Sequence, residues 1–437
     1  MTVQKTRFPT LVADIAGQPV GELARRFGTP LYVYDAAKIV ERINDLAAFD
    51  VVRFAQKACS SLAILDLVRR HGAVVDTVSA GEIRRALAAG FRPGPGEPPE
   101  IVYTADIFDR ESLDLVVEHD IPVNCGSPDM IDQLGKRASS LQRAGREITL
   151  RINPGFGHGH SQKTNTGGQQ SKHGIWHEQL GDCLARAARC QLTITGLHMH
   201  IGSGTDLEHL SQVCTAMAKT ASAVGPTVKS ISAGGGLPTP YREEDEEVDV
   251  AGYYTLWDGT RRQLAEQFGH PVSLEIEPGR YLVAESGSLI AEIRAVKQMG
   301  DNLFYLVDAG FNNLARPILY GAYHPMAICQ APSEPGRRSP SQTRPRLHDV
   351  VVGGPLCESG DIFTQESGGF VSSRKLPEAK VGDYLVIGCA GAYGAVMGSN
   401  YNTKPLAAEV LVEAGQARLI RARQTFEDMV RGEMIPK

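Results

Sequence analysis

The chain has 437 residues, which is too long for one compact core and predicts two domains. Its composition, 42% hydrophobic and 22% charged, is that of an ordinary soluble globular protein, and a net charge of −5 leaves no basic surface for nucleic acid. The sequence has neither a signal-peptide pattern nor an apolar run long enough to span a membrane, so we expect a cytoplasmic protein with no membrane partner. Eight cysteines without C-x-x-C pairs indicate free thiols in a reducing compartment.

Short apolar segments alternate with helix-like segments between residues 29 and 272. The expected strands are Pro30–Tyr34, Val51–Ala55, Val74–Thr77, Ile101–Tyr103, Pro122–Val123, Ile148–Ile152, Leu192–His200, Ser230–Ala233 and Val272–Ile276. The clearest helices between them are Ser61–His71, Ala80–Ala89 and Leu207–Val224. About eight β–α repeats predict an α/β fold with a parallel (β/α)8 barrel of the TIM type. An open doubly wound sheet is the alternative.

The pattern changes in the region 273–437. Six segments there are expected to be strands separated by turns: Val283–Val296, Leu303–Val307, Val350–Val352, Tyr384–Ile387, Glu409–Val412 and Gln416–Arg421. Strands that follow one another without intervening helices predict a second, mostly antiparallel β domain at the C-terminal end.

Lys57 directly follows the expected strand Val51–Ala55, in F-A-Q-K-A-C. The active site of a β/α barrel lies at the C-terminal ends of its strands, and a lysine there can form a Schiff base with a carbonyl. Alone, Lys57 is more simply read as a surface lysine. The other motifs of the chain reverse that reading.

Two further strand ends carry motifs. Gly234, Gly235 and Gly236 follow one strand, where their N–H groups can hold a phosphate; a plain tight turn is the alternative. Glu277 opens E-P-G-R after the next strand, and a carboxylate beside a pyridine nitrogen keeps that nitrogen protonated. An ion pair between Glu277 and Arg280 is the simpler alternative.

Histidines occur as two H-x-H pairs. His198 and His200 share a strand face, so they could bind a metal, or one imidazole could stack on a cofactor ring. No acidic or cysteine ligand is close in sequence, so we expect no metal. The pair His158 and His160 lies in a Gly-rich loop that we interpret as a flexible loop over the barrel mouth. Ser203, which closely follows the strand that carries His198 and His200, could donate to phosphate or simply occupy a turn.

Other candidates have simpler alternatives as well. Asp76 ends the expected third strand, where it could face a cofactor or cap a helix. Arg316 lies four residues before Tyr320, and an arginine suits a carboxylate; a surface ion pair is the alternative.

The C-terminal region contributes three more candidates. In C-E-S-G-D, Cys357 could return a proton to a carbanion and Glu358 could hold an ammonium group, or the cysteine could simply be buried in the loop. Tyr393, in G-A-Y-G, could reach a phosphate or pack at an interface.

Together these motifs resemble the barrel-type (fold type III) pyridoxal-phosphate decarboxylases, and among them the diaminopimelate decarboxylase family, over nearly the whole chain. The most specific pieces are H-M-H-I-G-S-G, S-A-G-G-G, E-P-G-R, D-A-G-F-N-N-L-A-R-P, G-P-L-C-E-S-G-D and G-A-Y-G-A-V-M-G-S-N-Y-N. The resemblance implies a barrel at 29–272 and a β-sandwich or β-barrel-like domain formed by 1–28 and 273–437. It also implies a homodimer whose active sites are shared between two chains. The chain departs from the common pattern at Gln56, Cys59 and Cys389.

The resemblance assigns a role to each candidate. Lys57 would carry pyridoxal phosphate as a Schiff base, and Cys357 of the other chain would be the proton donor. The cofactor-binding residues would be Lys57, Asp76, His200, Ser203, Gly235, Gly236, Glu277, Gly279, Arg280 and Tyr393. The substrate-binding residues would be Arg280, Arg316, Tyr320, Glu358 and Tyr393.

The implied reaction is the decarboxylation of meso-2,6-diaminopimelate to L-lysine and CO2, the last step of lysine biosynthesis. Charge supports this substrate, because its distal end needs a cation for the carboxylate and an anion for the amine, which Arg316 and Glu358 would supply. A decarboxylase of ornithine, lysine or arginine, or an amino-acid racemase on the same fold, remains the alternative.

Overall fold

The computed structural model describes residues 6–143, 145–157, 166–200, 207–331, 346–366 and 368–436. Contacts within the chain divide it into two compact units. The barrel unit comprises 40–239 and 247–282, and the β-rich unit comprises 1–39, 240–246 and 283–437. Among the helices described, none has the length and apolar character required to cross a membrane.

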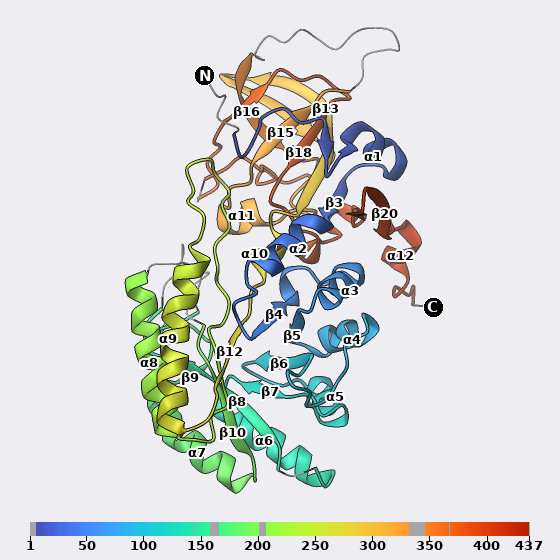
Figure 1. The fold of residues 1–437 in the computed structure, drawn as a ribbon. Helices are drawn as coiled ribbons and strands as arrows, with labels where there is room; N and C mark the ends of the chain where they lie inside the picture. The colour runs from blue at the N-terminus through green and yellow to red at the C-terminus, as the bar shows by residue number, and fades with distance from the viewer. Residues whose placement is uncertain are drawn as a thin grey trace. The chain divides into compact units, whose positions relative to one another are not determined.

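Eight parallel strands of the described chain close into a barrel (Figure 1). They follow one another in the order β10-β11-β12-β4-β5-β6-β7-β8, and the pairing of β8 with β10 closes the ring. Their bounds are β4 Val51–Ala55, β5 Val74–Thr77, β6 Ile101–Ala105, β7 Val123–Cys125, β8 Glu147–Asn153, β10 Thr193–His198, β11 Ser230–Ser232 and β12 Ser273–Ile276; the short β9, Ile175–Trp176, extends β8. The predicted barrel is confirmed, because an open sheet would leave β8 and β10 unpaired at its edges.

Helices connect successive barrel strands, with α2 before the first strand in sequence and α10 after the last. Their bounds are α2 Ala36–Asn44, α3 Leu62–Arg70, α4 Ala80–Ala88, α5 Arg110–Glu118, α6 Pro128–Ser140, α7 Leu180–Arg189, α8 Leu207–Val224, α9 Val250–Phe268 and α10 Arg280–Val283, with 3-10 turns η1 Gln56–Ala58 and η3 His177–Gln179. Several begin at side-chain caps: Ser79, Asp109 and Asp249 each accept a hydrogen bond from the backbone N–H three residues later. Each cap fixes the residue at which its helix begins, and so where the loop from the preceding strand ends.

The β-rich unit contains a mostly antiparallel sheet in the order β17-β16-β14-β13-β3-β19-β20, with β18 also paired to β13 and β15 paired to β18. The strands are β1 Asp14–Ile15, β2 Gln18–Pro19, β3 Leu31–Asp35, β13 Gly287–Met299, β14 Asn302–Val307, β15 Met326–Cys329, β16 Leu347–Gly353, β17 Arg374–Pro377, β18 Tyr384–Ile387, β19 Ala408–Glu413 and β20 Gln416–Arg421. The helices are α1 Val20–Phe27, α11 Arg316–Tyr320 and α12 Phe426–Val430, with 3-10 turns η4 Ala395–Met397 and η5 Tyr401–Thr403. Helix α1 packs its apolar face on this sheet, with Val20 and Leu23 in one core with Leu31, Ile290 and Val410.

One strand has a different partner from the one expected. Strand β3 pairs antiparallel with β13 and parallel with β19, so the expectation that Pro30–Tyr34 opens the barrel run is wrong. Its four apolar residues are buried in the β-rich unit instead. The barrel unit accordingly begins at Val40 and ends at Leu282, where the sequence pattern had suggested 29 and 272.

Candidate active site

The carboxyl ends of the barrel strands gather most of the predicted cofactor residues. Lys57 lies in the 3-10 turn that directly follows β4, with an exposed side chain between buried Gln56 and Ala58. Its charge acts on Asp76, near the end of β5, and on His200, after β10. Residues far apart in sequence thus meet at one end of the barrel, as the parallel strands dictate.

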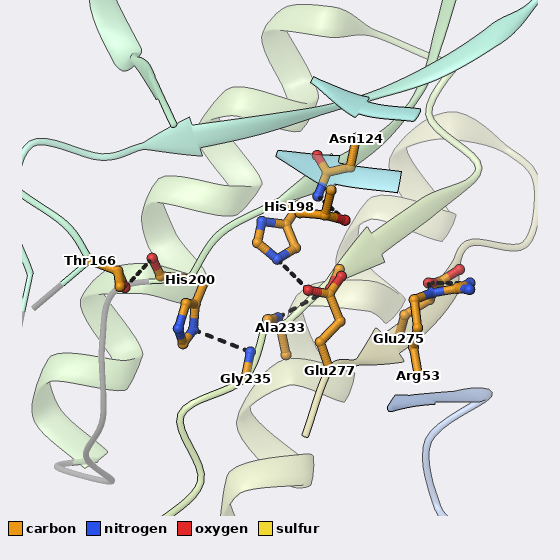
Figure 2. A network of polar contacts seen from close by, with 12 residues as sticks. Arg53, Asn124, Thr166, His198, His200, Ala233, Gly235, Glu275 and Glu277 are labelled. Carbon is orange, nitrogen blue, oxygen red and sulfur yellow. Dashed lines mark hydrogen bonds and ion pairs between the residues drawn. The ribbon is translucent and has the colours of Figure 1, made fainter. Parts of the chain in front are cut away.

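Three neighbouring strands build the surroundings of Glu277 (Figure 2). The Nε2 of His198, at the end of β10, lies 2.8 Å from Glu277 Oε2, and the hydroxyl of Ser232, at the end of β11, donates to Oε1 at 3.0 Å. Burial acts to raise the pKa of Glu277, but the charge and hydrogen bond of His198, together with Arg53 and Ser232, outweigh it and lower the pKa to about 2. Glu277 is therefore a buried carboxylate that stays ionised.

His200 is held in its neutral form. Its Nδ1 accepts a hydrogen bond from the backbone N–H of Gly235 at 3.2 Å (Figure 2), so the proton of the neutral ring is on Nε2. Burial, with the positive charges of Arg151 and Lys57, lowers the pKa of His200 well below its usual value. The backbone carbonyl of His200 accepts from the Thr166 hydroxyl at 2.9 Å. A neutral, fixed imidazole is suited to stacking rather than to proton transfer.

The three glycines after β11 are required by their surroundings. Gly234 has φ +64°, and a Cβ on it would lie 2.7 Å from the Cβ of His200. A Cβ on Gly235 would lie 2.5 Å from the carbonyl oxygen of Glu277, and Gly236 has φ +99°. The turn therefore brings bare backbone close to His200 and Glu277, and a side chain on Gly234 or Gly235 would collide with these neighbours.

Asp76 is also a buried carboxyl group, but its pKa is shifted in the opposite direction from that of Glu277. Its Oδ1 has no hydrogen-bond partner among the described residues. Burial and the nearby charge of Glu277 raise its pKa well above the usual value, although Lys57 and a hydrogen bond with Thr104 act in the opposite direction. A buried polar atom without a partner at a strand end marks a place where a ligand group can complete the hydrogen bonding.

The E-P-G-R segment packs directly against the lysine turn. The carbonyl of Pro278 accepts from the N–H of Ala55 at 3.1 Å, and a Cβ on Gly279 would touch Ala55 and Ala58 at 3.3 Å. Arg280 follows at the first position of α10 with a half-buried side chain. Gly279 thus lets this segment approach the turn that carries Lys57.

The β-rich unit holds the predicted substrate residues other than Arg280. Arg316 opens helix α11 and is buried, with 5% of its surface exposed, whereas Tyr320 ends the helix and is 40% exposed. The two residues therefore form the first and last positions of one short helix. Arg316 Nη1 donates to the hydroxyl of Tyr241 at 3.1 Å and contacts Nε2 of His324 at 2.9 Å.

The C-E-S-G-D loop is anchored by its last residue. Asp361 accepts hydrogen bonds from the N–H groups of Leu356, at 2.8 Å, and Phe311, at 2.7 Å. Cys357 and Glu358 are exposed on this loop, and the backbone N–H of Cys357 donates to Asn402 Oδ1 at 2.7 Å. The buried aspartate holds the backbone while leaving the thiol and carboxylate accessible.

Tyr393 occupies a crowded loop. Its φ is +55°, in the left-handed region that few side chains adopt, and its side chain is half-buried. On either side, a Cβ on Gly391 would overlap the carbonyl oxygen of Val283, and one on Gly394 would lie 2.9 Å from the Tyr32 hydroxyl. Strained backbone of this kind is common at binding sites.

Comparison with known proteins connects this geometry to a family. Residues 36–284 match the family described as "Pyridoxal-dependent decarboxylase, pyridoxal binding domain". The diaminopimelate decarboxylase of Escherichia coli strain K12 is 53% identical over 422 residues, which cover 97% of this chain and 98% of that enzyme. The chain belongs to the diaminopimelate decarboxylase family.

Other members of the family are similar to this chain in sequence and in structure. The Streptomyces coelicolor diaminopimelate decarboxylase is 52% identical over 428 residues, covering 98% of this chain and 94% of that one. A crystal structure of a diaminopimelate decarboxylase, 54% identical, superposes with a TM-score of 0.88 and covers 94% of this chain and 95% of its own. The Helicobacter pylori diaminopimelate decarboxylase, solved in complex with L-lysine, is 31% identical with a TM-score of 0.82. The match covers 94% of this chain and 98% of that one. The fold is that of the type III decarboxylases, and the cofactor is pyridoxal phosphate.

The barrel residues of this family member fit that cofactor. Glu277 supplies the permanent anion that a pyridinium nitrogen needs, and the Gly234–Gly236 turn presents backbone without side chains close to His200 and Glu277. Asp76 adds a buried oxygen that lacks a partner in the described structure. No group of three or more potential metal ligands occurs among the residues described.

Three residues named in the sequence analysis, Ser203, His158 and His160, lie outside the described residues. Two features of the site were not predicted from the sequence. The contact of His198 with Glu277 was missed, because a separation of 79 residues leaves no local signal. Ser232 was missed for the same reason. It is the first residue of the S-A-G-G-G motif and the last residue of β11.

Proposed function

We propose that the enzyme decarboxylates meso-2,6-diaminopimelate to L-lysine and CO2, the last step of lysine biosynthesis. The observation that carries the proposal is that Glu277, ionised beside His198 and Ser232, and Lys57 lie at the same end of the barrel. The relatives that are about half identical over nearly their whole length carry the name of this activity. We expect the enzyme to act in the cytoplasm.

In this proposal the barrel residues hold the cofactor. Lys57 would bind it covalently, His200 would stack on its ring and Glu277 would pair with the ring nitrogen. Ser203, Gly235, Gly236 and Tyr393 would bind the phosphate, and Asp76, Gly279 and Arg280 would complete the cofactor-binding set. When bound, pyridoxal phosphate supplies the electron sink that accepts the electrons released by the departing carboxylate.

The chain's own residues perform the remaining tasks. Glu277 keeps its negative charge across the physiological range, so it would keep the ring nitrogen of the bound cofactor protonated. His200, whose pKa is lowered, does not compete for that proton. Arg316 binds the distal carboxylate of the substrate, Glu358 its distal amine, and Tyr320 and Arg280 complete the grip. Cys357 returns a proton to the carbon that lost CO2.

We further propose that two chains form a homodimer with shared active sites, in which Cys357 and Glu358 reach the site of the partner chain. Both residues are exposed on a loop whose backbone is fixed by Asp361. An accessible thiol on a rigid loop is the arrangement expected of a group delivered to another chain.

The test replaces Lys57 with alanine in the purified enzyme. We expect Lys57→Ala to lose both the visible absorbance of the lysine-bound cofactor and the release of CO2 and lysine from meso-diaminopimelate. Lys229→Ala is the matched control, because Lys229 is exposed, pairs with Glu147 and precedes β11 at the opposite end of the barrel. A Lys57→Ala enzyme that retained absorbance and turnover would contradict the assignment. Retained cofactor in the wild type without lysine release would point to ornithine or arginine as the substrate.

A further inference from the structure

Arg316 contacts the side chains of Tyr241 and His324, both in the β-rich unit. Its Nη1 lies 3.1 Å from the hydroxyl of Tyr241 and 2.9 Å from Nε2 of His324, and its guanidinium carbon lies 4.9 Å from the centre of the Tyr241 ring. His324 and Tyr241 also contact each other edge-to-face, with ring centres 5.4 Å apart. His324 is only 1% exposed, so this arrangement is shielded from water.

The hydrogen bonds determine which form of His324 is present. A guanidinium only donates, so Nε2 of His324 must be the unprotonated acceptor. The ring proton then lies on Nδ1, which donates to the carbonyl of Gly388 at 3.1 Å. Gly388 directly follows strand β18, so the sheet fixes the imidazole and the imidazole fixes Nη1.

We propose that His324, as the neutral Nδ1–H tautomer, and Tyr241 are positioning residues that orient Arg316 for the distal carboxylate of the substrate. The proposal rests on the role given to Arg316 under the proposed function. A guanidinium is planar, so fixing one nitrogen and stacking the plane near a ring sets the direction of the whole group. Neither positioning residue adds a negative charge that would compete with a carboxylate for the arginine.

Two small ligands isolate the carboxylate contact. L-lysine carries the distal carboxylate, whereas cadaverine is the same diamine without it. We would measure each as a competitive inhibitor of meso-diaminopimelate decarboxylation by the holoenzyme, in the wild type, His324→Phe and His324→Gln. Phenylalanine fills the space without an acceptor, while the glutamine amide can accept from Arg316 and donate to Gly388.

For His324→Phe we expect the inhibition constant of L-lysine and the KM of meso-diaminopimelate to rise about tenfold or more, as for a lost hydrogen bond to a charged group. The inhibition constant of cadaverine should change less than about twofold, since it makes no contact with the arginine. His324→Gln should recover most of the lost affinity for L-lysine. Equal weakening of both inhibitors, or unchanged L-lysine inhibition, would overturn the proposal.

Tyr241→Phe provides a second variant that keeps the ring and removes only the hydroxyl. We expect it to weaken L-lysine severalfold and to spare cadaverine, and an unchanged L-lysine constant would overturn the role of Tyr241 even where the His324 variants fail to bind cofactor. The wild-type enzyme distinguishes a failure of the role proposed for Arg316 from a failure of the positioning role alone. If it did not discriminate L-lysine from cadaverine, the role of Arg316 in the proposed function would fail, whereas intact discrimination in His324→Phe would overturn the positioning role alone.

Discussion

Glu277 and Asp76 are two buried carboxyl groups of the barrel unit whose surroundings act in opposite directions. Burial disfavours the charge of both, but His198, with Arg53 and Ser232, lowers the pKa of Glu277 to about 2. For Asp76, burial and the charge of Glu277 together raise the pKa well above its usual value. Neighbouring carboxyl groups whose pKa values are pushed apart are characteristic of sites with divided roles.

The linkage between ionisation and folding differs in sign for the two groups. The lowered pKa of Glu277 contributes stability above the ordinary pKa of a glutamate, and that contribution is lost as the pH falls through about 2. The raised pKa of Asp76 has the reverse effect. The unfolded chain releases this proton at the ordinary aspartate pKa while the folded chain keeps it, so Asp76 destabilises the fold as the pH rises above that value.

We therefore predict that Asp76→Asn stabilises the cofactor-free enzyme. Asparagine keeps the size of the side chain and removes the charge, so the melting temperature should exceed that of the wild type at pH 8, and the gain should shrink as the pH falls towards 4. Thermal melts across this range measure the effect. Asp66→Asn is the control, since hydrogen bonds from Arg69 and Arg70 lower the pKa of Asp66 despite partial burial. A gain for Asp76→Asn that is the same at every pH would contradict the argument.

Single residues of the site could be predicted from sequence only where a motif marks them. Lys57, Glu277 and the glycines each follow an apolar strand, and the barrel topology then brings them together. The contact between His198 and Glu277 could not be predicted, because it depends on the adjacency of β10, β11 and β12 and on which imidazole nitrogen faces the carboxylate. The burial that separates the pKa values of Glu277 and Asp76 is likewise a property of the packed barrel.

At the scale of elements, the turn after β11 is defined by close backbone approach. We predict that Gly235→Ala weakens cofactor binding by about tenfold or more, because its Cβ would lie 2.5 Å from the carbonyl oxygen of Glu277 and backbone would have to move. The measurement is a titration of the cofactor-free variant with pyridoxal phosphate, followed by visible absorbance.

Gly259→Ala is the matched control for that change. Gly259 lies inside helix α9, and a Cβ there meets nothing within 4 Å. Alanine favours a helix over glycine by about 1 kcal/mol, so this variant should bind cofactor normally and melt at or above the wild-type temperature. If both glycine variants bound cofactor like the wild type, the tight turn would not be a binding element.

Elements were predictable where local pattern decides them, and strand partners were not. The helices α3, α4 and α8 lie within two residues of their expected ranges, because amphipathic spacing is a local property. Strand β3 has the same continuous apolar pattern as a buried barrel strand, yet it pairs with β13 and β19. The choice between two sheets is made by contacts hundreds of residues away, and a local pattern contains no information about them.

At the scale of the whole molecule, the predicted catalytic residues lie in different units: Lys57 in the barrel unit and Cys357 in the β-rich unit. The proposed homodimer with shared sites would pair the lysine of one chain with the cysteine of the other. In that arrangement each active site needs residues of both chains, so two inactive variants should complement each other.

We predict that mixing Lys57→Ala chains with Cys357→Ala chains restores activity. In a mixed dimer, one site combines both substitutions, while the other combines an intact Lys57 with an intact Cys357. Random exchange makes half of the dimers mixed, each with one of its two sites intact, so activity should approach about a quarter of the wild-type value. The measurement is lysine release after the chains are dissociated and reassociated together, compared with each variant treated alone. Sites formed within single chains would give no recovery above the two separate variants, because every chain in the mixture lacks either the lysine or the cysteine.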